Sequence, residues 1–404
     1  MADSDGRGGD RATHRLSRRR VLALSTLGLA AGLAGCSGGS GGDDTATEGD
    51  AADGTPTATP TAAATDAPTE TASPTATATP TDEPTATPAI SDVVGDYQCG
   101  SVDADPDITV AQDGSGDFET VAAAIEAVPD RSREETVVSI GPGRYYEKLR
   151  VPRSKVNLTL VGAGPTETTL TYDDHADKTN ERGDPIGTGG SASFTASPPD
   201  FTAANLAFEN DAEPVAQAVA AKVEGDRSLF RNCRFLGNQD TLYTIAPVRQ
   251  YYRDCYIEGD VDFIFGAATA YFENCEIFCK PDGGYVTAAS TPRSADYGYV
   301  FNNCEVTADG AADDSYYLGR PWRPYARTVF MNSTLGDHIA PAGWDNWGDE
   351  SKEETASYAE YDNDGPGYTP DQRVDWASQL SDFLAGNYAD PAEVLAGWDP
   401  TTCF

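Results

Sequence analysis

Basic residues are scarce in this chain of 404 residues. Lysine and arginine together number 28 against 65 aspartates and glutamates, and only six of the basic residues are lysine. The formal net charge of −37 disfavours nucleic-acid binding, because a phosphate backbone would be repelled and no basic stripe exists to hold it. Abundant carboxylate with little lysine is instead typical of proteins that stay hydrated at molar salt, where the Debye length is about 3 Å. We therefore expect a halophilic source.

Histidine is almost absent. The three histidines are His14, His175 and His338, and none of them lies near a cysteine in the sequence. Histidine and cysteine are the usual protein ligands of zinc, and they need to cluster to bind it. We therefore expect no metal site and no cofactor.

Long apolar runs are also missing, and the one short run lies near the N-terminus. Residues 21–35 (VLALSTLGLAAGLAG) follow SRRR at residues 17–20 and are too short to span a bilayer comfortably. This pattern is typical of a twin-arginine export signal, and the sequence Leu33-Ala34-Gly35-Cys36 resembles a lipobox. We interpret residues 1–36 as an export signal with lipidation at Cys36, which makes that anchor the only membrane contact. A plain signal cut near Ala34 is the alternative.

Aromatic residues are absent from residues 37–90, which consist almost entirely of Thr, Ala, Pro, Gly, Asp and Glu. Such a segment has nothing to bury and resembles O-glycosylated stalks, so we expect a disordered, extended linker. It would hold a catalytic domain off a membrane, at the cell surface or outside the cell. Residues 91–404 are sufficient for one large domain.

That domain contains an internal repeat. An Asn-Cys or Asp-Cys pair recurs after 22 residues, then after 20, and then after a longer gap, at residues 232–233, 254–255, 274–275 and 303–304. Each unit holds one short apolar strand bounded by Gly, Asn and Asp. This period predicts an all-β, right-handed, single-stranded parallel β-helix. We also expect a capping helix at residues 117–128, a loop at 173–190, and a tail helix at 373–384 packed along the outside.

The cysteines allow two arrangements. Seven remain when Cys36 is set aside, so at least one thiol is unpaired within the chain. Four of them hold the same place in their repeat units: Cys233, Cys255, Cys275 and Cys304. Buried cysteine commonly behaves as a small hydrophobe, whereas adjacent rungs also fall within the Cα separation that a disulfide allows. We favour a ladder of mostly free thiols, with disulfides between rungs as the alternative.

The offset of 22 also stacks two amides, two carboxylates and two aromatic rings. These pairs are Gln217 with Gln239, Asp240 with Asp262, and Tyr243 with Phe265. Neighbouring rungs lie about 4.8 Å apart, so the three pairs share one outer face. Polar ladders that plug turns explain amide columns, but stacked acids repel each other. One of the two carboxyls would therefore stay protonated as a general acid, while the fork of Arg320 would keep the other ionised.

Ordered sequence blocks give this face a family resemblance. The blocks are QAVAAKVEGDR (217–227), NQDTLY (238–243), GDVDFIFG (259–266) and YLGRPW (317–322), flanked by TVAQDGSGDFETV (109–121), GRYYEKLRV (143–151), AGW (342–344) and GPG (365–367). In order and spacing they resemble the signature blocks of pectin methylesterases, from about residue 109 to the C-terminus. Together with its charge and signal, the chain resembles a haloarchaeal-type exported lipoprotein of that family.

The resemblance implies hydrolysis of the methyl esters of polygalacturonate with release of methanol. It makes Asp262 the nucleophile of an acyl-enzyme anhydride, Asp240 the acid and then the base, and Gln217 and Gln239 the oxyanion hole, with Arg320 orienting Asp262. Four aromatic residues would bind sugar rings, with core packing as their alternative role: Tyr243, Phe265, Trp322 and Trp344. The expected partner is methyl-esterified homogalacturonan, and the expected state is a monomer.

Two other functions remain open at this stage. A pectate lyase shares the β-helix but needs a calcium cluster of acids and an Arg or Lys base, which Gln217 and Gln239 beside the acid pair fit poorly. A non-catalytic glycan-binding β-helix would keep the aromatic residues but would have no use for stacked aspartates paired with Arg320. We therefore favour the enzyme.

Overall fold

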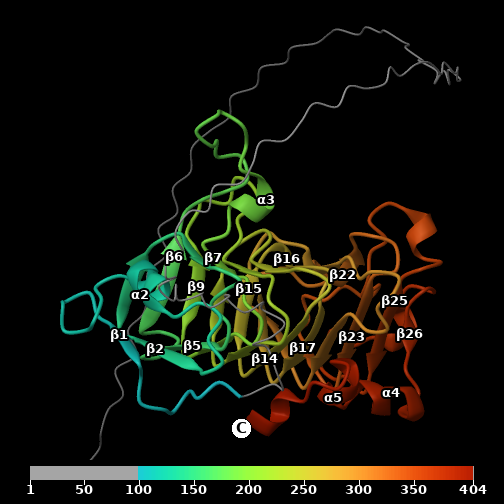
Figure 1. Cartoon of the computed structure of the whole chain (residues 1–404). Coiled ribbons are helices and arrows are strands. Elements are labelled where there is room, and N and C mark those ends of the chain that lie inside the picture. Colours follow the sequence, from blue (N-terminus) through green and yellow to red (C-terminus); the bar gives the residue numbers. More distant parts are fainter. Residues whose placement is uncertain (1–98, 404) are drawn as a thin grey trace, which may run out of the picture. The chain divides into compact units, whose positions relative to one another are not determined.

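The computed structural model describes residues 99–403, which form a right-handed parallel β-helix built from three parallel sheets (Figure 1). The export signal, Cys36 and the linker at 37–90 lie outside the described residues, so those interpretations stay predictions. Within residues 99–403, no helix is both long and apolar enough to cross a bilayer.

Each sheet is named here by a letter. Sheet A contains β1 (Ile108–Val110), β2 (Thr136–Ile140), β5 (Leu158–Gly162), β8 (Thr202–Ala204), β11 (Ser228–Arg231), β14 (Arg249–Arg253), β17 (Thr269–Glu273), β20 (Tyr299–Asn302), β23 (Arg327–Met331), β25 (Ser357–Tyr361) and β26 (Ser378–Gln379). Sheet B contains β3 (Gly143–Tyr146), β6 (Thr168–Tyr172), β9 (Ala207–Asn210), β12 (Arg234–Leu236), β15 (Tyr256–Gly259), β18 (Glu276–Cys279), β21 (Glu305–Ala308) and β24 (Thr334–Leu335). Sheet C contains β4 (Leu149–Val151), β7 (Phe194–Ala196), β10 (Ala221–Val223), β13 (Leu242–Thr244), β16 (Val261–Gly266), β19 (Tyr285–Ala289) and β22 (Tyr317–Pro321). From β2 to β24 the chain visits A, B and C in turn, so one rung is one strand from each sheet.

The register of these strands confirms the predicted offset of 22. Phe230 pairs with Tyr252 in sheet A, and Phe235 pairs with Ile257 in sheet B. Inside the coil the aromatic residues of sheet A form a continuous stack with ring centroids 4.2 to 5.0 Å apart: Phe230, Tyr252, Phe272, Phe301 and Phe330. Each such pair contributes roughly 0.5–1.5 kcal/mol beyond the burial of its area. The core therefore fixes which rungs are neighbours.

The thiol ladder is confirmed. Cys233, Cys255, Cys275 and Cys304 are buried and free, and so is Cys279. The thiol of each ladder cysteine lies 3.5 to 3.6 Å from a backbone carbonyl of the preceding rung. The Asn or Asp before each cysteine has a φ of 49° to 56°, a left-handed conformation that Asn and Asp tolerate better than other side chains do. This turn explains why Asn and Asp precede the cysteines in the repeat.

The capping helix exists but is shorter than predicted. The helix α2 covers Val121–Ala127, with Thr120 as N-cap, and buries Val121, Ala124 and Ile125. It does not begin at Asp117, because the carboxylate of Asp117 accepts hydrogen bonds from the backbone and hydroxyl of Thr109. Those bonds hold residue 117 in the preceding turn.

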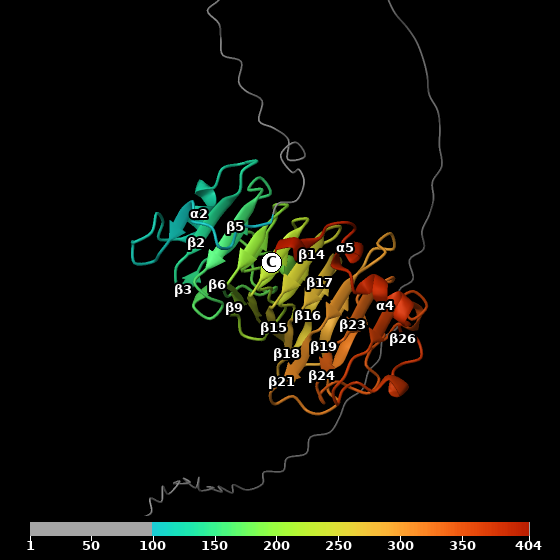
Figure 2. The same ribbon diagram turned by 90° about the horizontal axis from the view of Figure 1, so that it is seen from below.

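The prediction of one tail helix at residues 373–384 is wrong. Its start, Arg373, follows the 3-10 turn η2 (Pro370–Gln372) and is buried against Glu360, with Nε 2.6 Å from Oε1. The chain then adds β26 to sheet A, and Ser381 caps a later helix. The remaining helical segments are η1 (Glu350–Lys352), α3 (Gly187–Gly190), α4 (Asp382–Tyr388), α5 (Pro391–Val394) and η3 (Pro400–Cys403). Figure 2 shows α4 and α5 lying on the outside of sheet A, where α5 covers apolar side chains of β14 and β17.

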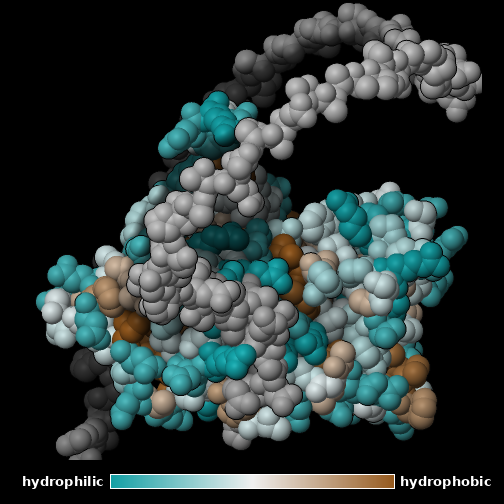
Figure 3. Space-filling model, in the orientation of Figure 1, coloured by the Kyte–Doolittle hydropathy of each residue, from teal (hydrophilic) through white to brown (hydrophobic). Residues whose placement is uncertain are grey.

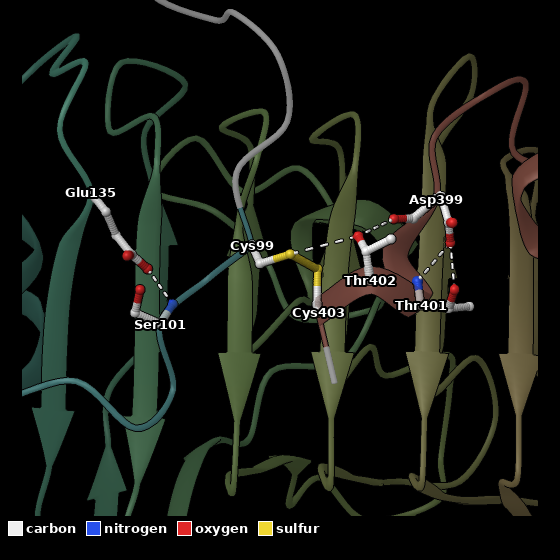
Figure 4. The surroundings of a disulfide bond; sticks show 7 residues. All are labelled: Cys99, Ser101, Glu135, Asp399, Thr401, Thr402 and Cys403. Carbon is white, nitrogen blue, oxygen red and sulfur yellow. Dashed lines mark hydrogen bonds between the residues drawn. A yellow bond between two sulfur atoms is a disulfide. The ribbon is translucent and has the colours of Figure 1, made fainter.

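A disulfide joins the two ends of the described chain. Cys99 and Cys403 are bonded with their Cα atoms 5.2 Å apart, although 304 residues separate them in sequence (Figure 4). The N-terminal segment continues past the bond, where the backbone N–H of Ser101 donates to Glu135. The sequence contains no local signal for this pair, and the prediction for the cysteines did not include it.

Candidate active site

The candidate site lies on the outer face of sheet C. On β13 and β16, Leu242 and Ile264 point into the core, while Tyr243 and Phe265 point outward. The two outward rings are stacked with centroids 4.2 Å apart and planes 11° apart. The strand register places Lys222, Tyr243, Phe265, Ala288 and Arg320 in one row across five neighbouring rungs.

Asp240 and Asp262 occupy equivalent positions on two of these rungs, Asp240 in the turn before β13 and Asp262 within β16. Both are nearly buried, with exposed fractions of 8% and 5%. Both have a left-handed backbone, with φ of 68° and 51°. At Asp262 the pairing of β16 with β19 shifts register, which marks a bulge that re-aims the side chain. Aspartate tolerates this left-handed conformation better than most side chains do.

Arg320 holds Asp262 with both prongs of its fork, as predicted. Its Nε donates to Oδ1 at 2.8 Å and its Nη2 donates to Oδ2 at 2.7 Å. The flat guanidinium lies between two rings, 3.6 Å from the centroid of Tyr285 and 3.8 Å from that of Trp347. The pairing fixes the plane of the carboxylate, because a bidentate bond allows little rotation.

The surroundings of Asp240 and Asp262 shift the pKa values of the two carboxyls by different amounts. Burial, and then the charge of Asp262, raise the pKa of Asp240 to about 8, although Arg320 opposes the rise. Burial also raises the pKa of Asp262, but the hydrogen bond from Arg320 works against that rise directly. The pKa of Asp262 remains raised overall, but Asp262 is the carboxyl of the pair that a hydrogen-bonded cation holds toward its ionised form, whereas Asp240 keeps its proton at neutral pH.

A pocket of ≈ 380 Å³ opens above the two carboxylates. Its walls hold both predicted amides, both aspartates, Arg320 and three of the four predicted aromatic residues: Gln217, Gln239, Asp240, Asp262, Arg320, Tyr243, Phe265 and Trp322. Gln217 and Gln239 are half-buried in the wall beside the acids. In the space-filling view, hydrophobic surface lies in the dip beside α3, over the region of β16 and β22 (Figure 3).

Trp344 is not part of this pocket, and its predicted role in binding is wrong. The side chain is 1% exposed and packs inside the coil, 4.6 Å from the ring of Tyr358. A parallel bridge between Trp344 and Gly319 turns its side chain inward. Trp347, which the prediction missed, lines the pocket instead. Its backbone N–H donates to Asp345 at 2.7 Å, and this turn, with φ of 63° at residue 347, aims the indole outward.

Two further parts of the wall were missed. The predicted loop at residues 173–190 ends in the short helix α3, whose Thr188 and Gly189 reach the pocket. Lys222 lies on the same side, with its ammonium 2.7 Å from Glu224. The position of Lys222 in the row before Tyr243 could have signalled its role. Loop residues such as Thr188 have no period to place them.

The described residues contain no group of three His, Cys, Asp or Glu side chains arranged to hold a metal ion. Of the two described histidines, His338 is buried inside the fold, 5.7 Å from the ring of Tyr316, and His175 is half-buried in the loop before α3. Neither lines the pocket above Asp240 and Asp262. The side chains that line this pocket carry carboxyl, guanidinium, ammonium, amide, hydroxyl and aromatic groups.

Comparisons with known proteins point to one family. The pectinesterase family model matches residues 107–389. The chain is 43% identical to pectinesterase 31 of Arabidopsis thaliana over 287 residues, which covers 70% of this chain and 90% of that protein. Other curated plant relatives are longer, and the chain spans 45% to 53% of their length.

Solved structures give the same result for the fold. Pectin methylesterase from carrot superposes with a TM-score of 0.69 at 35% identity, covering 75% of this chain and 98% of that one. A pectin methylesterase crystallised in complex with hexasaccharide VII superposes with a TM-score of 0.66 at 31% identity, covering 74% of this chain and 99% of that one.

Proposed function

Because this chain belongs to the pectinesterase family of carboxylic ester hydrolases, we propose that it hydrolyses the methyl esters of pectin and releases methanol. The observation that carries the proposal is the pair of buried aspartates, one held by the fork of Arg320 and the other with a pKa raised to about 8. Ester cleavage needs a nucleophile and a proton donor in one site, and this pair offers both at neutral pH.

In the first step of the proposed mechanism, an oxygen of Asp262 attacks the ester carbonyl carbon. The bond from that carbon to the methoxy oxygen breaks, and Asp240 gives its proton to the departing oxygen, so that methanol leaves. The galacturonyl group stays on Asp262 as a mixed anhydride. Arg320 orients the attacking carboxylate of Asp262, and it neither gives nor takes a proton in this step.

In the second step, water replaces methanol. Asp240, now ionised, takes a proton from the water as its oxygen attacks the anhydride carbonyl. The anhydride bond breaks, which releases the galacturonyl group as a free carboxylic acid, leaves Asp262 as a carboxylate and leaves Asp240 protonated. The released acid then loses its proton to the solvent. In each step negative charge gathers on the carbonyl oxygen, where the amides of Gln217 and Gln239 would donate hydrogen bonds.

Aromatic side chains would hold the polymer over these acids. Tyr243, Phe265, Trp322 and Trp347 line the pocket, and the apolar surface of aromatic rings suits the C–H surface of a sugar. Lys222 lies on the wall beside Tyr243, where its ammonium is paired with Glu224.

Methanol release from highly methylated pectin tests the proposal. Wild type should release methanol in high salt, while Asp262→Asn and Asp240→Asn should each retain the fold and lose activity by at least about a hundredfold, because each removes a group that reacts. Turnover above a few per cent in Asp262→Asn would contradict the covalent mechanism. A glycan binder would bind pectin but release no methanol. A pectate lyase would generate unsaturated products in a reaction that depends on calcium.

We also propose that the protein is exported and anchored through lipidated Cys36, and that it acts as a monomer. The support is the sequence at residues 17–36, and two acyl chains on one cysteine anchor stably whereas the acidic linker cannot. Cys36→Ser should move the protein from the membrane fraction into the medium without changing its esterase activity. Wild type that is already soluble in the medium would contradict anchoring.

A further inference from the structure

The guanidinium of Arg320 is enclosed on both faces. Its central carbon lies 3.6 Å from the ring centroid of Tyr285 and 3.8 Å from that of Trp347. A guanidinium donates hydrogen bonds only in its own plane. The two rings therefore leave its edge free for Asp262 and hinder any rotation that would turn the edge away.

Both rings are themselves held in place. Tyr285 stacks on Tyr317, its register partner on β22, with centroids 5.5 Å apart and planes 14° apart. On the other side, Trp347 is fixed by the hydrogen bond from its backbone N–H to Asp345, and the ammonium of Lys352 lies 5.5 Å from its ring. Tyr317, Tyr285, Arg320, Trp347 and Lys352 thus form one continuous stack, and we call the part formed by Tyr285 and Trp347 around Arg320 the clamp.

We propose that Tyr285 and Trp347 are positioning residues that hold Arg320 in the plane of the Asp262 carboxylate and so keep that carboxylate ionised and aimed. The inference rests on the proposed role of Asp262 as nucleophile and adds two residues that do not touch the reacting atoms. Tyr285 is the more informative of the two. Among the described residues it does not line the pocket, so its removal leaves the pocket wall intact.

The charges around Asp262 give the direction of the effect. The titratable groups that face it are Arg320 from β22, Asp240 from the turn before β13, Asp345 after β22, Tyr285 from β19 and Tyr358 from β25. Burial, first, and the charge of Asp345 favour the neutral carboxyl, and Arg320 is the group that opposes them. If Arg320 turns out of plane, the pKa of Asp262 rises, and the enzyme needs a higher pH to ionise its nucleophile.

The test uses Tyr285→Leu with a matched control. In sheet B, Arg234 lies 4.2 Å from the ring of Tyr256, which stacks on Phe278 with centroids 5.9 Å apart. Tyr256→Leu therefore removes an equivalent ring from an equivalent stack away from the pocket. Methanol release is measured against pH, and the Asp262 carboxyl is titrated by ¹³C NMR in aspartate-labelled protein, its signal identified by loss in Asp262→Asn.

Tyr285→Leu should move the acidic limb of kcat/KM, and the NMR titration with it, upward by at least about half a pH unit. It should lower kcat and leave KM within about twofold of wild type. Tyr285→Phe keeps the ring, so the acidic limb and the NMR titration should stay at their wild-type positions. Tyr256→Leu should not move either of them.

Three results would overturn the proposal. They are an unmoved Asp262 titration in folded Tyr285→Leu, a raised KM with an unmoved acidic limb, and an equal shift in Tyr256→Leu. If Tyr285→Leu does not fold, Trp347→Leu replaces it, read by the NMR titration. If wild type releases no methanol, the proposed function fails, but the titration of Asp262 still decides whether the clamp exists.

Discussion

Asp240 and Asp262 occupy equivalent positions with a left-handed backbone on neighbouring rungs, yet only Asp262 is hydrogen-bonded to a cation. The guanidinium of Arg320 bonds to Asp262 with two hydrogen bonds, whereas Asp240 is affected by it only through charge. Burial would neutralise both carboxyls, so the difference between them comes from where one arginine fork points. The proposed division into acid and nucleophile is thus a property of the pair and not of either residue.

The pH dependence of turnover should follow from this division. The proposed mechanism requires Asp262 ionised and Asp240 protonated, so activity should rise as Asp262 loses its proton and fall as pH passes through about 8, where Asp240 loses its own. Initial rates of methanol release across pH, at constant high salt, measure both limbs. An alkaline limb near pH 5 would mean that Asp240 is not the acid.

Ionisation of Asp240 should also lower the stability of the folded protein at high pH. Its folded pKa is raised to about 8, far above that of an unfolded aspartate, so the folded state binds the proton more tightly. The stability that this protonated carboxyl contributes is complete below the unfolded pKa and is lost as pH rises through about 8. Asp240→Asn cannot ionise, so it should raise Tm relative to wild type at pH 9 by at least about 2 °C. The difference should shrink at pH 4, and a constant difference would contradict the linkage.

The sequence placed most of the site because a β-helix converts a sequence offset into contact. Once Tyr243 aligns with Phe265, Asp240 must lie near Asp262. The failure at Trp344 has a different origin. The direction of Trp344 depends on a bridge to Gly319, and the outward direction of Trp347 depends on a turn held by Asp345. Neither feature belongs to the repeat. For residues outside the repeat, the sequence could suggest a candidate for the site but could not predict the direction of its side chain.

At the scale of elements, the turn between sheets A and B is the most regular part of the coil. Asn232, Asp254, Asn274 and Asn303 repeat one left-handed conformation, and the amide of Asn303 donates to Asn274 at 2.8 Å. The polar side chain therefore serves two purposes, since it tolerates the backbone and links the rungs. The repeat was visible in the sequence because every unit needs this turn.

Asn274 provides a test of that turn. Asn274→Ala should destabilise the fold by about 1–2 kcal/mol, because alanine is strained at positive φ and the amide link is lost. Asn274→Gly removes the same link without the backbone strain, so it should cost clearly less. Urea unfolding of the two variants measures the difference. Equal costs would mean that the side chain, and not the backbone conformation, explains the asparagine.

The tail could not be read in the same way. Arg373 begins an apparently helical stretch, but its side chain is buried against Glu360 of β25 and donates to the carbonyls of Ala340 and Pro341. A buried charge without its partners is expensive, so these bonds decide the local backbone. Their partners lie outside the stretch itself, and a local pattern cannot reveal them.

At the scale of the whole molecule, charge is the dominant property. The net charge of −37 concentrates repulsion when the chain becomes compact. Tm should therefore rise steadily as KCl increases from about 0.1 M to about 3 M, because the Debye length falls from about 10 Å to less than 3 Å. Differential scanning calorimetry across the series measures this. Equal Tm at both ends would contradict a halophilic source.

The seven cysteines of residues 91–404 end in two different states, with five buried thiols and one bond between Cys99 and Cys403 at the ends of the described chain. An unfolded chain that met an oxidant would expose all seven and could join them in many wrong pairs. Once folded, the coil hides five of them, and the two that remain accessible are already neighbours. The correct disulfide then forms without any rearrangement of wrong pairs, provided that folding comes before oxidation. A transporter that carries finished proteins across the membrane meets that condition, whereas one that threads an extended chain does not. The order of folding and oxidation thus gives a reason, independent of the arginines at residues 18–20, to expect export in the folded state.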